Sequence, residues 1–385
     1  MFRIHLPACL ICLAALASAG EVTPSPKPQD VDALIDQAQR FLLAQAQPSG
    51  AFVPGAKFSI GMTGLVVEAL ARQPQAIAVD DLRMAKALSY IDGFRQPDGG
   101  VYDPAEGLGN YNTSIALLAW ARTGAGETAA ITAAQNYLFS IQNTQPDSPS
   151  RGGMGYARSS QGPGWEDLSN TSWAIEALRA SGVPASDPRM QAAIGFLERC
   201  QDLSAVNALP WVRNSGGAVY APHESQAGGS WNRQPVAAGA AAPRLEAYGS
   251  MTYALISSYV ALNIGPTDPR VQAALGWIRA HWTTERNPGM TNTPEKPTAD
   301  QQGLFNYYRV ASKTFDLLRI GSLDLPDGLR IDPHAELYAA LVRRVRRDGD
   351  QAWWANDQDR WAEGTPALAT AYAVQNLKII RQRLP

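Results

Sequence analysis

Two kinds of helix alternate along the chain after residue 30, and the order of hydrophobic and polar positions separates them. In segments such as 131–141 and 190–200, apolar residues recur every three or four positions, with Gln, Asn, Arg and Glu between them. That spacing predicts helices that pack on one face and meet water on the other. In segments such as 114–122 and 172–180, small or apolar residues occur nearly all round the helix, which predicts full burial.

The pair of an amphipathic and a buried helix recurs six times. Two amphipathic helices begin almost identically, because residues 187–193 and 268–274 both read Asp-Pro-Arg-x-Gln-Ala-Ala. A supersecondary unit repeated at a regular period determines the architecture, and six such pairs can close into a ring. We therefore predict an all-α fold, an (α/α)6 toroid of six inner and six outer helices, over residues 31–385. The buried, inner helices are predicted at 64–71, 114–122, 172–180, 252–263, 310–320 and 366–378.

The predicted helix ends carry residues that commonly cap helices. Asp followed by Pro is expected to cap three outer helices, at Asp187, Asp268 and Asp332. Thr is expected to cap three inner helices, at Thr113, Thr171 and Thr365.

The first 30 residues differ from the rest of the chain. Arg3 precedes an apolar run at 6–16, and Ala-Ser-Ala follows at 17–19, a pattern typical of a cleaved signal peptide. We predict a signal peptide at 1–20, a Pro-rich linker at 21–30, and a mature protein that is secreted or periplasmic and does not span the membrane. Cleavage would leave Cys200 as the one cysteine, so no internal disulfide is expected.

The charge balance narrows the classes of partner. The 385 residues carry a formal net charge of -2. This value gives no electrostatic case for binding nucleic acid, whose recognition depends on a basic surface. The expected ligand is instead a small molecule or an oligosaccharide in the central cavity.

A glycine-rich loop between the helices resembles a known motif. Residues 96–102 read Gln-Pro-Asp-Gly-Gly-Val-Tyr, and partial copies occur at 47–52, 152–156, 216–220 and 348–353. The loop resembles the Gln–Gly–aromatic motif of squalene-hopene cyclases. With the Thr/Ser-rich helix after each loop, the repeats resemble those shared by squalene cyclases and protein prenyltransferase β subunits, over residues 35–380. The resemblance implies the toroid and a hydrophobic ligand.

The catalytic motifs of these families are not matched. Squalene-hopene cyclases use an Asp-x-Asp-Asp motif, and the nearest string here, Asp-Val-Asp-Ala at 30–33, lies at the start of the chain. Protein prenyltransferases hold zinc with Asp, Cys and His, whereas Cys200 has no His nearby in the sequence. We therefore expect no metal and no cofactor, and the resemblance specifies the repeat rather than an activity.

The segments that lead into the inner helices should gather at one end of the ring, and they are rich in aromatic and acidic residues. A desolvated carboxyl group can act as an acid or a base, and aromatic faces can hold a cation or an apolar ligand. At least one of the glutamates 166, 246 and 363 should face inward with a raised pKa. The candidate catalytic residues are Glu166, Glu246, Asp357 and Glu363. The candidate ligand-binding residues are Tyr111, Trp165, Trp231, Tyr248, Tyr307, Tyr308, Lys313, Trp353, Trp354 and Trp361.

Three classes of function remain open at this point. The first is a terpene-cyclase-like or prenyltransferase-like protein that holds a hydrophobic ligand, which the repeats favour. The second is an exported carbohydrate-active enzyme, because Trp, Asp and Glu clusters suit sugars. The third is a repeat scaffold that binds a peptide or protein without catalysis.

Overall fold

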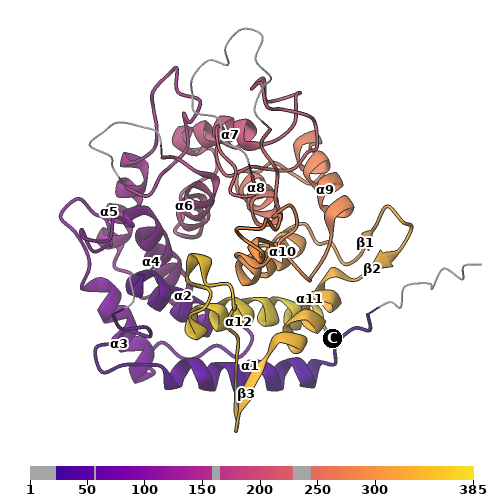
Figure 1. The fold of residues 1–385 in the computed structure, drawn as a ribbon. Helices are drawn as coiled ribbons and strands as arrows, with labels where there is room; N and C mark the ends of the chain where they lie inside the picture. The colour runs from indigo at the N-terminus through magenta and orange to yellow at the C-terminus, as the bar shows by residue number, and fades with distance from the viewer. Residues whose placement is uncertain (1–22, 56–57, 158–164, 229–243) are drawn as a thin grey trace, which may run out of the picture.

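The computed structural model describes residues 23–55, 58–157, 165–228 and 244–385. Inner and outer helices alternate along these residues (Figure 1). The inner helices are α2 (Ser59–Ala71), α4 (Gly109–Thr123), α6 (Leu168–Ala180), α8 (Gly249–Ala261), α10 (Leu304–Leu317) and α12 (Pro366–Arg383). The outer helices are α1 (Pro28–Ala44), α3 (Leu82–Asp92), α5 (Thr128–Ser140), α7 (Pro188–Cys200), α9 (Pro269–His281) and α11 (Pro333–Arg344).

The inner helices form a closed ring. Each of them packs on the next one along the chain, and α12 packs on α2. Helix α1 packs on α12 and so covers the point at which the ring closes (Figure 1). The predicted (α/α)6 toroid is therefore confirmed. Helix α1 begins at Pro28, inside the segment expected to be a linker, whereas the predicted signal peptide lies outside the described residues.

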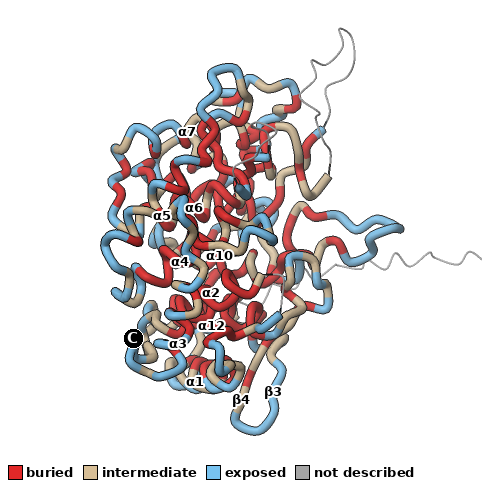
Figure 2. Tube along the Cα trace, turned by 90° about the vertical axis from the view of Figure 1, so that its left-hand side faces the viewer, coloured by how far each residue is buried: buried red, intermediate tan, exposed pale blue. Residues whose placement is uncertain are grey.

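Burial follows the two hydrophobic patterns. Helix α2 buries nearly every residue from its start to Leu70, whereas α7 buries one stripe that ends at Cys200. Figure 2 shows buried residues concentrated in the inner helices. Short strands lie between α10 and α12, and they pair as two antiparallel hairpins. The pairs are β1 (Leu323–Asp324) with β2 (Arg330–Ile331), and β3 (Arg346–Asp348) with β4 (Gln351–Trp353).

The Thr residues of the inner helices have a role different from the predicted one. Thr113 and Thr171 lie inside α4 and α6, so the prediction that they cap these helices is wrong. Each hydroxyl instead accepts a hydrogen bond from the glycine-rich loop, from Val101 N and Met154 N, both at 2.9 Å. The hydroxyl ties the loop to its helix, and the same bond joins Phe52 to Thr63, Ala218 to Thr252, and Trp354 to Thr370.

Of the other predicted caps, the three aspartates cap their helices and Thr365 does not. Asp187, Asp268 and Asp332 each accept a backbone N–H at the start of an outer helix, as predicted. Thr365 occupies the position before α12, but its side chain makes no capping bond.

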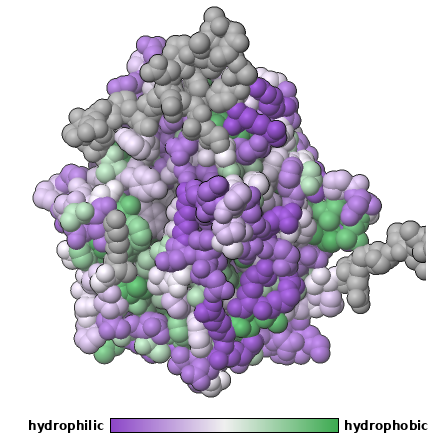
Figure 3. Space-filling model, viewed as in Figure 1, coloured by the Kyte–Doolittle hydropathy of each residue, from purple (hydrophilic) through white to green (hydrophobic). Residues whose placement is uncertain are grey.

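Among the described residues, none of the helices is both long and apolar enough to cross a membrane. On the face shown in Figure 3, hydrophilic residues predominate and hydrophobic residues form small, separate patches.

Candidate active site

The first turns of the inner helices meet at one end of the ring, which we call the mouth. Five of these helices begin three to six residues before their predicted starts, for example α4 at Gly109 rather than 114 and α10 at Leu304 rather than 310. The additional turns contain Gly, Ser and Asn, which are poor helix formers and so conceal the helix in the sequence. These polar turns place Ser169, Ser250 and Asn306 beside a cavity.

The cavity at the mouth, which we call the aromatic cavity, has a volume of about 160 Å³. Aromatic and aliphatic side chains supply most of its wall, and a few polar groups interrupt it. Such a composition is typical of small-molecule sites. Its lining residues are Phe58, Met62, Leu108, Tyr111, Tyr156, Ser169, Asn170, Trp173, Tyr220, Tyr248, Ser250, Met251, Gly303, Asn306, Trp361, Ala362, Glu363, Leu368 and Tyr372.

The aromatic rings in this wall hold one another in place. Tyr111 and Trp173 meet edge to face, with ring centroids 5.8 Å apart. The hydroxyls of Tyr156 and Tyr220 lie 3.3 Å apart. Trp361 and Tyr156 are the most accessible aromatic residues of the wall, with 43% and 39% of their surfaces exposed. These contacts pack the rings against one another around the cavity, and Trp361 and Tyr156 lie at its exposed side.

Glu363 is the predicted acid that lies in the wall of the aromatic cavity. It is 1% exposed, and it accepts hydrogen bonds from the backbone N–H groups of Phe305 and Asn306 at the start of α10. The side chain of Asn356 donates a third bond at 2.9 Å. Burial raises the pKa of Glu363 to about 7, although these donors act to lower it. The expectation of an inward-facing glutamate with a raised pKa is met.

Asp167 is a second buried acid near the mouth. It is 1% exposed and caps α6 by accepting hydrogen bonds from Asn170 N and Asn170 Nδ2, both at 2.8 Å. Burial raises the pKa of Asp167 to about 7, and hydrogen bonds from Asn170 and Tyr220 act to lower it. Both mouth acids are thus held by uncharged donors, and both can carry a proton near neutral pH.

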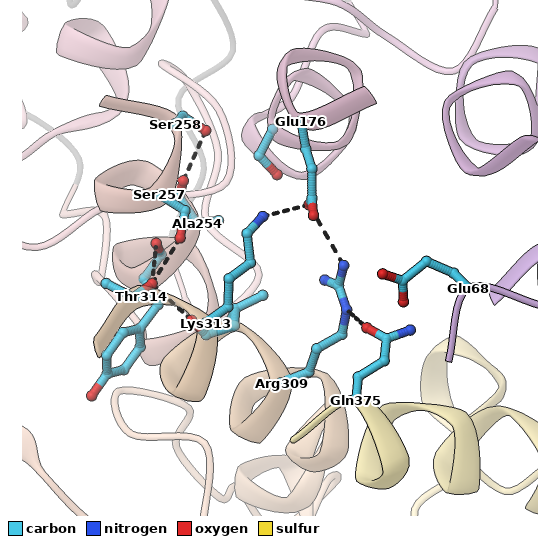
Figure 4. A network of polar contacts seen from close by, with 12 residues as sticks. Glu68, Glu176, Ala254, Ser257, Ser258, Arg309, Lys313, Thr314 and Gln375 are labelled. Carbon is cyan, nitrogen blue, oxygen red and sulfur yellow. Dashed lines mark hydrogen bonds and ion pairs between the residues drawn. The ribbon is translucent and has the colours of Figure 1, made fainter. Parts of the chain in front are cut away.

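A second cavity, which we call the ionic cavity, lies between α6, α8 and α10 and has a volume of about 340 Å³. Its central contact is an ion pair between Lys313 Nζ and Glu176 Oε2 at 2.6 Å (Figure 4). Arg309 approaches the same carboxylate at 3.5 Å, donates to Gln375 at 2.7 Å, and lies 4.1 Å from the centre of the Trp173 ring. Lys313, a predicted ligand-binding residue, therefore pairs with the Glu176 carboxylate.

Some of the predicted catalytic and ligand-binding residues lie together. Tyr111, Tyr248, Trp361 and Glu363 line the aromatic cavity, although they come from distant parts of the chain. Lys313 lines the ionic cavity. The first four converge because the segments that precede the inner helices meet at one end of the ring.

Four predicted aromatic residues belong to the core instead. Tyr307 and Tyr308 lie within α10 and donate their hydroxyls to the carbonyls of Thr283 and Thr284, outside the ring of inner helices. A helix turns by about 100° per residue, so Asn306 takes the cavity-facing position and the two tyrosines point elsewhere. Trp353 stacks on Phe41 of α1 with ring centroids 5.3 Å apart. Trp354 is fully buried, and its indole donates to Leu341 O.

The remaining predicted acids do not line the aromatic cavity. Glu246 is paired with Arg244 at 2.6 Å and its side chain is 42% exposed. Asp357 is paired with Arg346 at 2.7 Å and its side chain is 95% exposed. Solvation satisfies both carboxylates, so neither has the desolvated position that was expected. Glu166 is 6% exposed but is not among the residues of the cavity wall.

Two predicted tryptophans also differ from the expectation. Trp165 is 74% exposed and does not contribute to the aromatic cavity. Trp231 lies outside the described residues.

Sequence reasoning missed several parts of the wall. Tyr156 and Tyr220 end two glycine-rich loops, so their place in the repeated motif was a usable signal. Trp173 and Tyr372 lie inside apolar helices, where nothing in the pattern separates a cavity-lining ring from a core ring. In the described part of the chain, no group of three or more His, Cys, Asp or Glu side chains is placed to hold a metal ion.

Comparison with known proteins identifies the fold through structure alone. No protein-family model matches the sequence, and no curated protein matches it. The type II terpene cyclase MstE from Scytonema is 15% identical, with a TM-score of 0.53 over 93% of this chain and 100% of that chain. A variant of that cyclase, solved with the substrate geranylgeranyl dihydroxybenzoate, is 14% identical and has a TM-score of 0.53 over 93% of this chain and 99% of that chain.

A protein from Actinoplanes is also similar, at 15% identity and a TM-score of 0.54 over 91% of this chain and 99% of that chain. These matches extend over nearly the whole of both chains, so they include the ring of inner helices and not one repeat. The resemblance expected from the repeats is confirmed at the level of fold: the chain folds as the α/α toroid of the type II terpene cyclases.

Proposed function

We propose that this protein binds an isoprenoid, or a similar unsaturated hydrocarbon chain, in the aromatic cavity. The observation that carries the proposal is the wall at the mouth, where Tyr111, Trp173, Tyr248, Trp361 and Tyr372 surround one cavity. Aromatic faces contact alkenes favourably and exclude water from them. The structural similarity to a cyclase that binds a geranylgeranyl compound supports the same class of ligand.

The proposal covers binding and does not extend to cyclisation. Glu363 is a carboxyl group whose pKa of about 7 makes it a weak acid, and three hydrogen bonds hold its oxygens at the start of α10 and at Asn356. Protonating an alkene requires a much stronger acid aimed at the ligand. We therefore assign Glu363 to the wall and to the support of α10.

A carbohydrate ligand is less well supported by the same wall. Glycosidases use two carboxyl groups that face the sugar from opposite sides. Of the described residues that line the aromatic cavity, Glu363 alone carries a carboxyl group. We also propose that the protein acts outside the cytoplasm, a proposal supported by Arg3 and the apolar run at 6–16.

The test is ligand binding by the mature chain. Calorimetric titration and thermal shift should detect farnesol and geranylgeraniol, but not cello-oligosaccharides or peptides. Leu108→Trp, which fills the cavity from its rim, should weaken farnesol binding about tenfold or more, since apolar contact area is lost. Trp361→Ala should also weaken it, whereas the matched control Trp165→Ala should not. Stabilisation by oligosaccharides alone, or equal effects of the two Trp variants, would refute the proposal.

A further inference from the structure

The aromatic cavity and the ionic cavity lie against each other. Five residues line both of them, and these residues come from the inner helices α6, α8 and α10. Trp173 stands at this boundary, with the Arg309 guanidinium 4.1 Å from its ring. One ligand that passes this boundary would therefore contact apolar rings at one end and charged groups at the other. The shared residues are Ser169, Trp173, Ser250, Met251 and Asn306.

The volumes point to a ligand that occupies both cavities. Ligand sites usually measure about 300–1,000 Å³. The aromatic cavity alone, at about 160 Å³, lies below that range. The ionic cavity, at about 340 Å³, lies within it. An isoprenoid chain too long for the first cavity would extend toward the second, because the two cavities share lining residues.

The charged groups around the ionic cavity are not balanced. Among the described residues that line it, Arg179, Arg309 and Lys313 carry positive charges and Glu176 carries a negative charge. Arg179 also donates to Val183 O at 2.7 Å, and Arg309 lies near the Glu68 carboxylate (Figure 4). The side chain of Arg309 is 5% exposed and that of Lys313 is 21% exposed, so water screens these charges only in part. Excess positive charge in an enclosed site favours a bound anion.

Hydroxyl groups complete a polar lining around these cations. Ser172 donates to Ser169 O at 2.9 Å, and Ser258 donates to Ala254 O at 2.8 Å. The Ser257 and Thr314 hydroxyls lie 2.8 Å apart (Figure 4). The hydroxyl oxygens of such serines keep a lone pair, and their rotation can redirect the O–H toward a bound oxygen. The cavity thus combines fixed cations with adjustable donors.

We infer that the ionic cavity binds the anionic head group, a phosphate or a carboxylate, of an amphiphile whose isoprenoid chain lies in the aromatic cavity. This inference rests on the proposed function for the position of the chain. Lys313 and Arg179 would contact the head group. Arg309, which lies between Trp173 and Glu176, would attract the anionic head group without contacting it. The Glu176 carboxylate would repel the head group and so limit the affinity for it.

The experiment compares farnesol, farnesyl phosphate, farnesoic acid and inorganic phosphate by calorimetric titration at low salt. Farnesyl phosphate should bind at least about tenfold more tightly than farnesol, because charge-assisted hydrogen bonds are stronger than neutral ones. The comparison with farnesoic acid distinguishes a phosphate site from a carboxylate site. Inorganic phosphate alone should bind weakly and should compete with the head group.

Variants of the charged residues that line the ionic cavity test whether the head group binds there. Lys313→Gln and Arg179→Gln should each reduce the preference for farnesyl phosphate over farnesol several-fold, and Glu176→Gln should increase it. Arg189→Gln removes an exposed cation from α7 and should leave the preference unchanged. Arg179 lies near the end of α6 and is only partly buried, so its variant remains informative if the Lys313 variant does not fold.

The outcomes separate the two proposals. Equal binding of farnesol and farnesyl phosphate would overturn the head-group site and leave the proposed function standing. A preference for the phosphate that survives both Lys313→Gln and Arg179→Gln would also overturn it, because the anion would then lie elsewhere. Failure of every isoprenoid probe to bind would overturn the proposed function and this inference together.

Discussion

Glu363 in the aromatic cavity and Glu176 in the ionic cavity are both enclosed carboxyl groups, and their surroundings shift the pKa in opposite directions. Burial raises the pKa of Glu363 to about 7, since its partners are uncharged N–H donors. Burial acts in the same direction on Glu176, but Lys313 and Arg309 outweigh it and lower the pKa to about 2. Charged partners thus outweigh the effect of burial on a carboxylate, whereas uncharged N–H donors do not. One ring of helices therefore holds a neutralisable acid at its mouth and a permanent anion further in.

The largest expected effect comes from removing the permanent anion. Glu176→Ala leaves Lys313 and Arg309 enclosed without their carboxylate, and it should lower the free energy of unfolding by about 4 kcal/mol. Urea denaturation at pH 7 measures this loss. The matched control is Glu198→Ala. Its partner Arg270 keeps a second ion pair, with Asp268 at 2.8 Å, so this variant should lose less than about 1 kcal/mol of unfolding free energy. Equal losses in the two variants would remove the distinction drawn for the ionic cavity.

The pH dependence of stability should reveal the neutralisable acid. The folded pKa of Glu363, about 7, lies above the ordinary value of 4.5 for a glutamate. Its contribution is therefore fully present below pH 4.5 and is lost as the pH rises through 7. The loss should reach about 3 kcal/mol, at 1.36 kcal/mol per pKa unit. Asp167 acts in the same direction, with a folded pKa of about 7.

Glu363→Gln should remove its share of this pH dependence, as measured by urea denaturation between pH 4.5 and 8.5. Glu176 works in the opposite sense, because its folded pKa of about 2 lies below 4.5. Its contribution is present above pH 4.5 and is lost as the pH falls through 2. Parallel stability profiles for the wild type and Glu363→Gln would contradict the assignment.

A smaller effect is expected from one partner of Glu363. Asn356 donates to Glu363 Oε2 at 2.9 Å and to Gln301 O at 2.7 Å. Asn356→Ala should cost about 2 kcal/mol at pH 8, where the carboxylate is charged, and about half of that at pH 5. Thermal denaturation at the two pH values measures the difference. An identical cost at both values would show that the bond to Glu363 contributes nothing measurable.

The smallest effect tests the scaffold that both cavities share. Thr171→Val removes the hydroxyl that accepts Met154 N, and it should cost about 1 kcal/mol, because that buried N–H loses its partner. Thr365→Val is the control, since the Thr365 side chain makes no capping bond, and its cost should stay within about 0.5 kcal/mol. Farnesol affinity should be unchanged in both variants. A selective loss of farnesol binding in Thr171→Val would mean that this bond shapes the aromatic cavity.

The sequence predicts the toroid because its signal is spread over the whole chain. The alternation of amphipathic and buried helices is repeated six times, so an error in one copy does not change the architecture. The sequence predicts five inner-helix starts too late, because their first turns contain Gly, Ser and Asn, which are poor helix formers. These turns carry Asn306 and Ser250, so an error of a few residues concealed part of the site.

The site was predicted in part because topology, rather than side-chain chemistry, determines which segments meet. The position of Glu363, Tyr248 and Trp361 before an inner helix predicts that they lie at the mouth, and all three line the aromatic cavity. Tyr307 met the same criterion and lies outside the cavity, since the rotation of α10 sends its ring away. Glu176 is missing from the predicted site because α6 carries two charges, Glu176 and Arg179, and the sequence pattern does not indicate which of them points into the ring.

The packing of α12 on α2 limits how such a protein can change over time. An open solenoid gains or loses a repeat at little cost, because each repeat contacts only its neighbours. A closed ring has a fixed circumference, so duplication of one helix pair would force every other interface to a new angle. Evolutionary change is therefore confined to side chains and to the segments that connect the helices. These segments differ widely in length, from the short connection at 124–127 to the long one at 201–248. We expect descendants of this chain to differ in those segments while keeping the number of helices.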